Sequence, residues 1–284
     1  MLSKLKGQTA IKNVLQDMIK CYKKGLCKFP HTLLIASAGQ GKTTLAKMLA
    51  SELNPNYTEV FGPALSTADA LVNVLKSSNE ILFVDEIHAI PKEIQELMYS
   101  VMTNGKVARS DGGYDNVAVK TIIGATTDPQ MMLIPLKERF INTMVFAPYS
   151  KEDLVQCLLE HFNFCTMDII SQYKIAELAH GTPRKLLALV EKLKYFMGAR
   201  DITRFTKEYL NEFMSYNGLD KFGFDTLQQK YVNILKQYKK PCSLTLLSAM
   251  MSLRPEVITQ MIEPDVVRAG VVKITSKGRI YEPE

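Results

Sequence analysis

The stretch ASAGQGKTT, residues 36–44, combines residue types that hold a chain of phosphates. Gly41, Lys42 and Thr43 match the end of the pattern G-x-x-x-x-G-K-[ST], in which the glycines let backbone N–H groups turn inward, the lysine reaches the outer phosphates and the hydroxyl binds Mg²⁺. Ala36 replaces the first glycine, but it ends a strand, where a small residue matters and a positive φ is not required. We therefore predict a site for ATP and Mg²⁺ with the phosphate-binding residues Gly39, Gln40, Gly41, Lys42, Thr43 and Thr44.

Two adjacent acids, Asp85 and Glu86, follow the apolar run ILFV. At the carboxyl end of a buried strand, Asp85 can hold the water shell of Mg²⁺ together with Thr43, and Glu86 can orient or deprotonate the attacking water. Unpaired buried carboxylates are costly, so such a pair is rarely structural. The pair predicts a working site, with Thr43 and Asp85 binding the metal and Glu86 acting in catalysis.

Three more polar side chains stand near these acids in the predicted sheet. Thr126 and Thr127 end the run IIGATT, and either hydroxyl could hydrogen-bond the γ-phosphate or the water; we predict Thr127 as the catalytic one. Threonine is common at strand ends, so this prediction depends on the loop and the acids. His88 is interpreted as a capping or packing residue rather than a catalyst.

The elements that must position these residues alternate between strands and helices. Apolar runs at 32–37, 58–62, 80–85 and 119–127 predict short strands, and TMVFAP at 143–148 supplies one more. Segments between them, such as KTTLAKMLASEL, have helical spacing. This alternation implies parallel crossovers and a sheet covered on both faces. We predict an α/β domain over residues 1–148.

The pattern changes after Pro148 to helices alone, at 151–162, 169–179, 184–196 and about 205–213. We expect no strand partner for the sheet in this segment and predict a separate helical domain over residues 149–217. Residues 218–284 follow as helices, strand, tight turn and strand. That order predicts a C-terminal winged-helix domain.

Basic charge is denser in this last segment. It holds ten Lys and Arg against seven Asp and Glu, a net charge of +3, while the other 217 residues also carry +3, from 25 against 22. Lysine and arginine grip DNA phosphates without reading sequence, and we predict Lys273, Lys277 and Arg279, beside the turn at Gly278, as DNA contacts. The alternative is a solvated hairpin tip without a ligand.

The composition is that of an ordinary globular protein. Of the 284 residues, 46% are hydrophobic, and no apolar run reaches the length of a membrane span. The five cysteines are odd in number and show no C-x-x-C pair, which argues against a disulfide framework or a zinc cluster and favours reduced, mostly buried thiols. We expect a cytoplasmic protein without a membrane partner.

The stretches GQGKTTLA, FVDEIH, IGATT, PLKERF and HGTPRKLL occur in the order and approximate spacing found in AAA+ ATPases. Over nearly its whole length the chain resembles most closely the RuvB family of bacterial Holliday-junction branch-migration motors. The resemblance implies that Arg139 is an arginine finger acting on a neighbouring subunit, that Arg184 in the helical lid touches the phosphates of its own site, and that Tyr149 lies near the base. Arg139 and Arg184 would then both serve catalysis.

The resemblance also implies an assembly and an activity. The arginine finger implies a ring, expected to be a hexamer, that hydrolyses ATP to translocate double-stranded or branched DNA and so drives branch migration in recombination and repair. DNA would be bound by its structure rather than its sequence.

Three departures from the family stand in this sequence. Only Met1 to Lys6 precede GQ, where the family has an extension that helps enclose the adenine, so base preference stays open. Residues 99–120 are shorter than the family's hairpin that docks its partner RuvA, so a RuvA-like partner stays open as well. Ile274 stands near a DNA-contacting arginine of the family, and Lys273 is its candidate substitute.

Two other functions fit the same elements. A helicase loader or replication-initiation factor would bind DNA without translocating it, because a similar ATPase base, lid and winged helix occur in such proteins. A nucleotide-dependent binding module with little turnover is the third hypothesis. The acid pair and Arg139 argue against that module.

Overall fold

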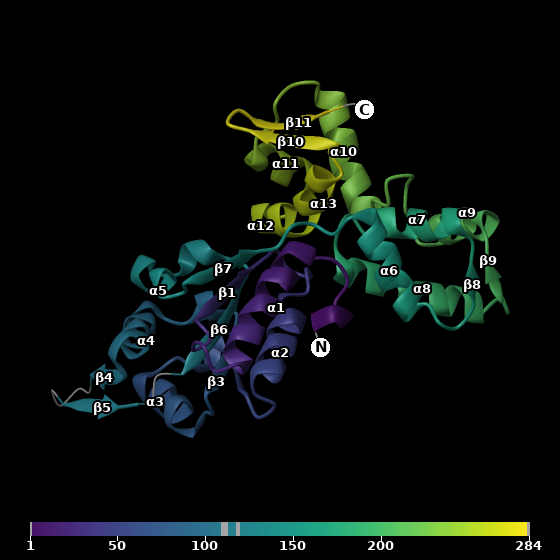
Figure 1. Ribbon diagram of the computed structural model, residues 1–284. Coiled ribbons are helices and arrows are strands. Elements are labelled where there is room, and N and C mark those ends of the chain that lie inside the picture. The colour runs from purple at the N-terminus through teal and green to yellow at the C-terminus, as the bar shows by residue number, and fades with distance from the viewer. Residues whose placement is uncertain (1, 109–112, 118–119, 283–284) are drawn as a thin grey trace. The chain divides into compact units, whose positions relative to one another are not determined.

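Five parallel strands form the sheet of the N-terminal part of the computed structural model, which describes residues 2–108, 113–117 and 120–282 (Figure 1). The strand order is β2-β3-β6-β1-β7, so β1 lies inside the sheet between β6 and β7. These strands are β1 (Thr32–Ile35), β2 (Thr58–Phe61), β3 (Ile81–Asp85), β6 (Thr121–Thr126) and β7 (Asn142–Val145). Every apolar run predicted as a strand therefore joins one parallel sheet.

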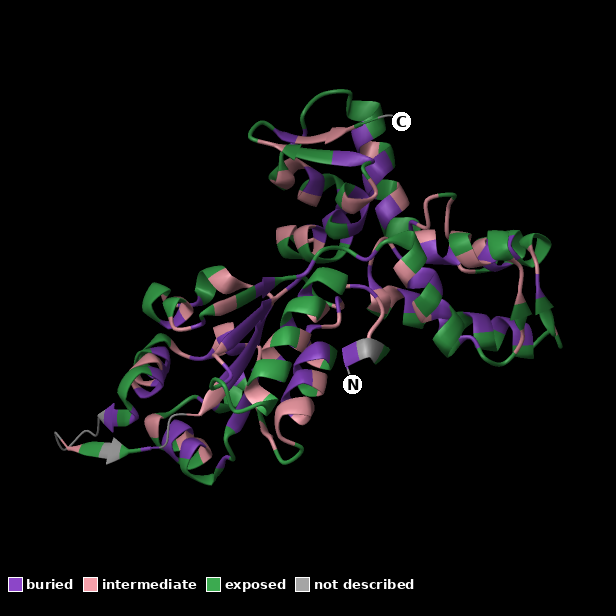
Figure 2. Ribbon diagram, viewed as in Figure 1, coloured by how far each residue is buried: buried purple, intermediate pink, exposed green. Residues whose placement is uncertain are grey.

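Neighbouring residues of the central strands serve opposite faces of this sheet. Leu33 and Leu82 belong to one apolar cluster, while the next residues along their strands, Leu34 and Phe83, belong to another. Because side chains alternate along a strand, this is the pattern of a sheet with helices on both faces. Figure 2 shows the central strands as buried. The strands consequently read as continuous apolar runs.

Helices cover the two faces. The cluster around Leu34 includes residues of α1 (Thr9–Lys23) and α2 (Lys42–Leu53), and the cluster around Leu33 includes residues of α3 (Ala68–Ser77), α4 (Lys92–Asn104) and α5 (Ile134–Glu138). Short 3₁₀ turns complete the unit: η1 (Leu2–Lys4), η2 (Gly62–Ala64), η3 (Ile87–Ala89) and η4 (Pro129–Met131). The predicted α/β class is confirmed.

A small antiparallel hairpin follows α4. It pairs β4 (Lys106–Ala108) with β5 (Tyr114–Asn116), and Gly105 ends α4 with a φ of 69°. A left-handed backbone favours glycine, which explains the turn predicted at Asn104–Gly105. The DGG turn predicted at residues 111–113 lies largely outside the described residues.

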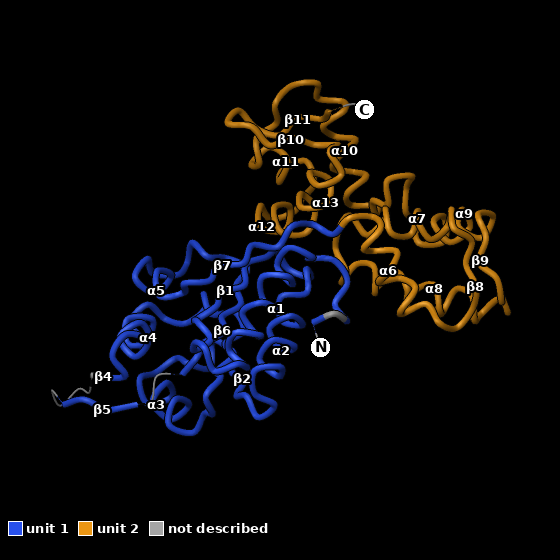
Figure 3. The backbone as a smooth tube through the Cα atoms, viewed as in Figure 1, with its two compact units in different colours: residues 1–149 blue, residues 150–284 orange. Residues whose placement is uncertain are grey.

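The chain forms two compact units, residues 1–149 and 150–284 (Figure 3). The second unit begins with α6 (Lys151–His161), α7 (Ile169–Leu178), α8 (Pro183–Gly198) and α9 (Lys207–Tyr216). Ser150 and Asp168 start α6 and α7 by accepting N–H hydrogen bonds from Asp153 (3.0 Å) and Ser171 (2.9 Å). This helical region agrees with the predicted helices within a few residues.

This region was predicted to hold helices alone, but two short strands pair within it. β8 (Thr166–Met167) and β9 (Arg204–Phe205) run parallel to each other, separately from the main sheet. Each strand has two residues, too few for a period-two pattern to be visible in sequence. They join the loop before α7 to the loop before α9.

The rest of the second unit is a winged helix. It contains α10 (Thr226–Tyr238), α11 (Leu244–Met251) and a third helix made of α12 (Pro255–Val257), the π-helical turn η5 (Ile258–Ile262) and α13 (Glu263–Arg268). Pro264 has no N–H and its ring clashes with the carbonyl one turn earlier, which explains the wider turn before it. β10 (Val272–Thr275) and β11 (Gly278–Tyr281) form the wing. The predicted boundary at 217/218 lies within this unit and stays a prediction.

The cysteines were expected to be mostly buried, but only Cys242 is, while Cys21 and Cys27 are exposed at the end of α1 and in the loop after it. In the part of the chain that the structure describes, no helix is both long and apolar enough to cross a membrane.

Candidate nucleotide site and nucleic-acid interface

The glycine-rich loop joins the end of β1 to the start of α2. Gly39 and Gly41 have φ values of 79° and 85°, and Gly41 caps α2, so the free N–H groups of the first turn of α2 follow directly. Ala36 is not among the described residues with positive φ; its N–H donates to the Thr126 carbonyl at 3.3 Å and so extends the pairing of β1 with β6. The expectation that Ala36 needs no positive φ is confirmed. The loop has the backbone of an anion-binding site.

Lys42, the first residue of α2, is buried beneath this loop. Its Nζ donates to the carbonyl oxygens of Ala36 (2.9 Å) and Ser37 (3.4 Å). Tyr149 is also buried, and its hydroxyl would lie 3.2 Å from a side chain added at Gly41. Tyr149 therefore borders the phosphate loop itself. Gly41 is required both by its φ and by this close approach.

Thr43 and Asp85 come from different elements and meet at the sheet edge. The Thr43 hydroxyl donates to Asp85 Oδ2 at 3.0 Å. In residues 2–108, 113–117 and 120–282, no group of three or more His, Cys, Asp or Glu side chains could hold a metal. A hydroxyl and one carboxylate nevertheless fit Mg²⁺, which prefers oxygen ligands and keeps waters and substrate phosphates in its shell. The pair is suited to a metal that arrives with a nucleotide.

Glu86 adopts a left-handed backbone conformation, with φ and ψ both 49°. Its N–H donates to Asp85 Oδ1 at 3.1 Å, and its carbonyl accepts from the Ala89 N–H at 2.9 Å. A side chain added at Gly62 would come within 2.3 Å of that carbonyl oxygen. Only glycine fits at residue 62, so Gly62 helps to fix the backbone of Glu86. Sequence reasoning missed this role, although a glycine as the last residue of the strand predicted at 58–62 was a visible signal.

The Glu86 carboxylate is held by two side chains. Thr127 Oγ1 donates to Glu86 Oε2 at 3.2 Å, and His88 Nδ1 lies 3.3 Å from the same oxygen. His88 Nδ1 also lies 3.0 Å from Thr126 Oγ1. The structure thus brings together Thr43, Asp85, Glu86 and Thr127 as predicted. His88, which was interpreted as a capping or packing residue, contacts this carboxylate after the 3₁₀ turn of η3, and its role stays a prediction.

The two predicted arginines lie elsewhere in the chain. Arg139 follows α5 and donates from Nε to Thr103 Oγ1 of α4 at 2.7 Å. Arg184 is the second residue of α8, in the second unit, and is exposed. The catalytic roles of Arg139 and Arg184 stay predictions.

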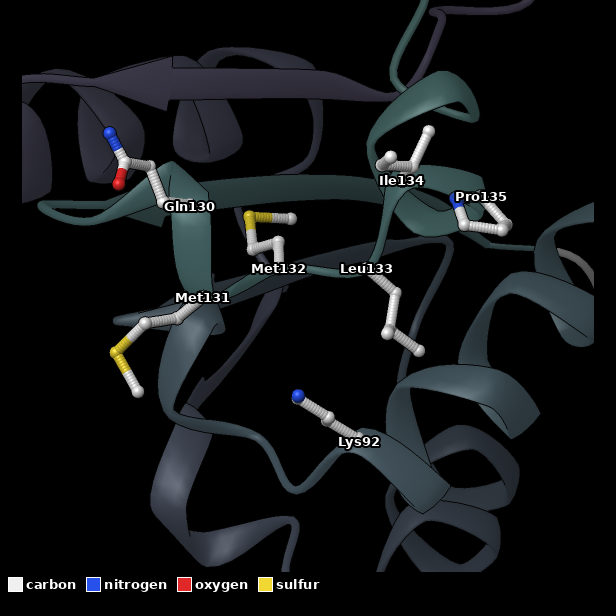
Figure 4. Close-up of a pocket in the computed structure, with 7 residues that line it drawn as sticks. All are labelled: Lys92, Gln130, Met131, Met132, Leu133, Ile134 and Pro135. Atoms are coloured by element: carbon white, nitrogen blue, oxygen red, sulfur yellow. The ribbon is translucent and has the colours of Figure 1, made fainter.

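A separate pocket of about 590 Å³ lies beside the segment that follows β6 (Figure 4). Figure 4 shows Lys92 of α4 facing residues 130–135, which are mostly apolar. None of the predicted nucleotide-site residues lines it. The buried side chain of Gln95 fixes the segment, accepting from the Leu133 N–H at 2.8 Å and donating to the Ile90 carbonyl at 2.8 Å. Apart from Lys92 and Gln130, the side chains that line this pocket have no hydrogen-bond donor to offer a phosphate.

The three predicted DNA contacts differ in their surroundings. Lys277 is exposed at the tip of the wing, and Lys273 is 63% exposed and pairs with Glu282 at 3.3 Å. Arg279 is only 16% exposed; its Nε lies 2.7 Å from Glu263 Oε1 and its second terminal nitrogen 3.2 Å from Oε2. The Arg279 guanidinium is committed to the interior of the winged helix, so its geometry does not support a DNA contact.

Polar contacts join the helical region to the winged helix within the second unit. Arg268 donates to Thr182 Oγ1 at 2.6 Å and to the His180 carbonyl at 3.1 Å, and Lys185 pairs with the buried Asp265. The His180 ring stacks on Phe224, with ring centres 5.4 Å apart. These contacts surround the first turn of α8, where Arg184 stands.

A five-stranded parallel sheet, a glycine-rich loop before α2 and acids at the end of β3 define a P-loop ATPase of the AAA+ class. Residues 1–145 match the family of the Holliday junction DNA helicase RuvB P-loop domain, and residues 221–284 match the RuvB C-terminal winged helix domain. The chain belongs to the RuvB family. Membership of this P-loop ATPase family implies ATP binding.

Relatives resemble the chain over nearly its full length. The Holliday junction branch migration complex subunit RuvB of Neorickettsia sennetsu is 30% identical over 98% of this chain and 88% of its own, and that of Leuconostoc mesenteroides is 31% identical over 96% and 82%. The solved Holliday junction branch migration motor RuvB of Thermotoga maritima has a TM-score of 0.85 at 26% identity, covering 99% of this chain and 94% of its own.

Proposed function

We propose that this protein is an ATP-driven motor that translocates double-stranded DNA and drives branch migration of Holliday junctions in recombination and repair. The observation that carries the proposal is the group formed by Thr43, Asp85, Glu86 and Thr127 at one sheet edge, behind a loop suited to phosphates. The names of the relatives, which are branch-migration subunits, support the choice of DNA substrate.

In the proposed reaction, Lys42 and the N–H groups at the start of α2 hold the outer phosphates of ATP. Thr43 and Asp85 would hold Mg²⁺, and the ion would supply positive charge against the phosphate oxygens. Glu86 takes a proton from water as the water oxygen bonds to the γ-phosphorus. The bond from the γ-phosphorus to the bridging oxygen breaks, and ADP leaves with its electron pair. Thr127 orients the water or the γ-phosphate.

The proposed catalytic unit is a ring, in which Arg139 stabilises charge on the phosphoryl group bound by the neighbouring subunit. Ile134 and Ile141, on either side of Arg139, are 65% and 81% exposed, which supports a contact with a second copy of this chain. We expect a hexamer. Arg184 would touch the phosphates of its own subunit, and Tyr149 the nucleotide beside Gly41.

DNA would be held by the wing through Lys273 and Lys277. Both lysines belong to the most basic segment of the chain, and lysine contacts to phosphates bind DNA without regard to sequence. The motor would therefore respond to branched or double-stranded DNA in general.

The decisive experiment is ATP-dependent branch migration of a synthetic four-way junction by the purified protein, with Glu86→Gln as the catalytic variant and Glu96→Gln, an exposed glutamate on α4, as the matched control. We expect Glu86→Gln to lose about 10²- to 10⁴-fold in rate, since it removes the general base. Migration by the wild type and the control, but not by Glu86→Gln, would support a DNA motor.

A loader or initiation factor is the alternative, favoured by the small hairpin, whose strands β4 and β5 have three residues each. The same experiment separates the two when a RuvA-type partner is first omitted and then added. DNA-stimulated hydrolysis without strand movement under both conditions would overturn the motor and favour the loader. Movement only with the partner would assign it a RuvA-like partner.

A further inference from the structure

We propose that His88 is a positioning residue for Glu86: the hydrogen on His88 Nδ1 holds Glu86 Oε2, so that the carboxylate faces the water it deprotonates. This inference rests on the ATP hydrolysis proposed above and names a residue that prepares its general base. It is carried by the meeting of three elements, the end of β3, the turn η3 and the end of β6, around one carboxylate oxygen.

His88 and Thr126 are more deeply buried than the Glu86 carboxylate that they support. The His88 side chain is 14% exposed, Glu86 is 30% exposed, and Thr126 is fully buried. Thr126 Oγ1 lies 3.0 Å from His88 Nδ1 and accepts a hydrogen bond from the Asp128 N–H at 3.1 Å. The buried Thr126 hydroxyl therefore helps to fix the position of the His88 ring. The Glu86 carboxylate is therefore more accessible to solvent than the His88 ring that contacts it.

The protonated nitrogen of His88 can be assigned from its neighbours. Nδ1 lies 3.3 Å from Glu86 Oε2, and an ionised carboxylate only accepts hydrogen bonds. An unprotonated Nδ1 would bring its lone pair within 3.3 Å of that oxygen, which is repulsive. A hydrogen on Nδ1 is attracted to it and can be shared with Thr126 Oγ1. The surroundings therefore select the imidazole form that carries its hydrogen on Nδ1.

Among the described residues, the side chains that contact the Glu86 carboxylate follow β3 and β6. On the other side of β3, β2 pairs Phe61 with Asp85, and Phe61 is an apolar side chain that is 55% exposed. Phe61 offers no hydrogen bond to a carboxylate. Without His88, Thr127 would be the one described side chain left to hold Oε2.

A fixed Oε2 matters because proton abstraction depends on orientation. A general base must lie within hydrogen-bond reach of the water, and a group held in place does not have to reorganise during the reaction. With Oε2 occupied by His88 and Thr127, Oε1 is the oxygen that receives the proton. Loss of one of the two holders leaves Glu86 in place but less well oriented.

The kinetic test uses the full chain and two substitutions of similar size. His88→Leu removes the donor, and His88→Asn restores an N–H near the position of Nδ1. We expect His88→Leu to lower kcat for ATP hydrolysis by about 10- to 100-fold, because misplacing a catalytic group by about 1 Å costs up to about 10²-fold. KM for ATP should change by less than about threefold, and His88→Asn should recover most of the rate. His161→Asn, at an exposed histidine, is the control.

Coupling to Glu86 separates positioning from a structural role. In the Glu86→Gln background, His88→Leu should cause no further loss of rate, since the base that it orients is gone. A full additional loss, or a His88→Asn variant as slow as His88→Leu, would overturn the positioning role. So would a wild-type kcat in His88→Leu.

A second readout does not require hydrolysis. Nitrogen-15 NMR of the labelled imidazoles, with the His88 signals identified by their absence in His88→Asn, should show a hydrogen on Nδ1, and Glu86→Ala should shift them. A bare Nδ1 in the wild type would overturn the assignment. If the wild type hydrolyses no ATP, the proposed function fails, and the NMR result still decides whether His88 holds Glu86.

Discussion

Glu86 in the first unit and Glu263 in the winged helix are both held by a nitrogen group and a hydroxyl. Glu86 uses Oε2 for both His88 and Thr127, and its side chain is 30% exposed. Glu263 gives one oxygen to Arg279 and Tyr231 (2.7 and 2.9 Å) and the other to Arg279 again, and its side chain is 5% exposed. The Glu86 carboxylate remains accessible to a ligand, whereas the hydrogen-bonding capacity of the Glu263 carboxylate is taken by groups of the protein itself.

The protonation states in the winged helix reinforce this difference. Burial, followed by the charge of Glu263, raises the pKa of Tyr231, and the hydrogen bond to Glu263 raises the pKa of Arg279. Both groups therefore remain donors over the whole range in which the protein functions. A carboxylate that accepts three hydrogen bonds from two permanent donors is a structural element, because most of its roughly four lone-pair sites are already used within the fold.

Neutralising each glutamate in turn should produce the largest difference in stability between the two sites. Glu263→Gln should destabilise the winged helix by about 3–5 kcal/mol, because it leaves the Arg279 charge buried without its partner. Glu86→Gln, with the same chemical change, should leave stability within about 1 kcal/mol. Thermal unfolding followed by the near-ultraviolet signal of the tyrosines measures both.

The contrast between the two variants is itself the control. Nucleotide binding by the first unit should survive Glu263→Gln at temperatures below its unfolding. Equal losses of stability in the two variants would contradict the distinction between an open and a closed carboxylate.

A smaller effect on stability is expected at His180, which lies among the polar contacts between the helical region and the winged helix. Its Nε2 is buried and, among the described residues, has no hydrogen-bond partner. Burial, and then the charge of Lys185, lowers the pKa of His180 from 6.5 to about 4. As the pH falls below about 6.5, the unfolded chain binds a proton that the folded chain refuses, so stability decreases until about pH 4.

This difference corresponds to about 2 kcal/mol between pH 7 and pH 5. His180→Asn should remove that part of the pH dependence, since asparagine tolerates the positive φ of 48° and does not titrate. Urea unfolding at the two pH values, with hydrogen exchange of the α7 and α8 amides to locate the change, measures it. His161→Asn should keep the wild-type slope, and an unchanged slope in His180→Asn would contradict the prediction.

The smallest effect is expected in the wing, where the exposed Lys277 lies near Arg279, which is paired with Glu263. Lys277→Ala should weaken DNA binding a few-fold and lower the slope of log affinity against log salt by about one, as expected for the loss of one phosphate contact. Lys230→Ala, at an exposed lysine of α10, should leave the slope unchanged. Equal slopes for both variants and the wild type would exclude Lys277 from the interface.

Several features were predictable because they depend on contiguous residues. The parallel sheet followed from apolar runs that alternate with helical segments, and the phosphate loop from glycines between a strand and a helix. Asp85 and Glu86 were predictable because they directly follow the buried residues of β3. In each case the residues that form the feature are adjacent in the sequence.

Other features depended on approach in three dimensions. His88 was interpreted as a capping or packing residue, and sequence does not reveal that the turn η3 brings its Nδ1 to within 3.3 Å of Glu86 Oε2. Gly62 stands 24 positions before Glu86, yet its missing side chain makes room for the Glu86 carbonyl. The two-residue strands β8 and β9 are too short to leave a pattern.

Arg279 shows most clearly what the sequence could not predict, because its pairing with Glu263 depends on tertiary structure. Charge density and a glycine turn were enough to predict a basic wing, because net charge and turn residues belong to the sequence alone. Which of those cations faces solvent was decided by packing. β11 pairs with β10 and, through Arg279, with Cys242, so the Arg279 side chain is turned toward Glu263, while Lys277 stays at the exposed tip. Sequence thus determined the kinds of groups available, and tertiary structure decided which were satisfied within the protein and which were left for ligands.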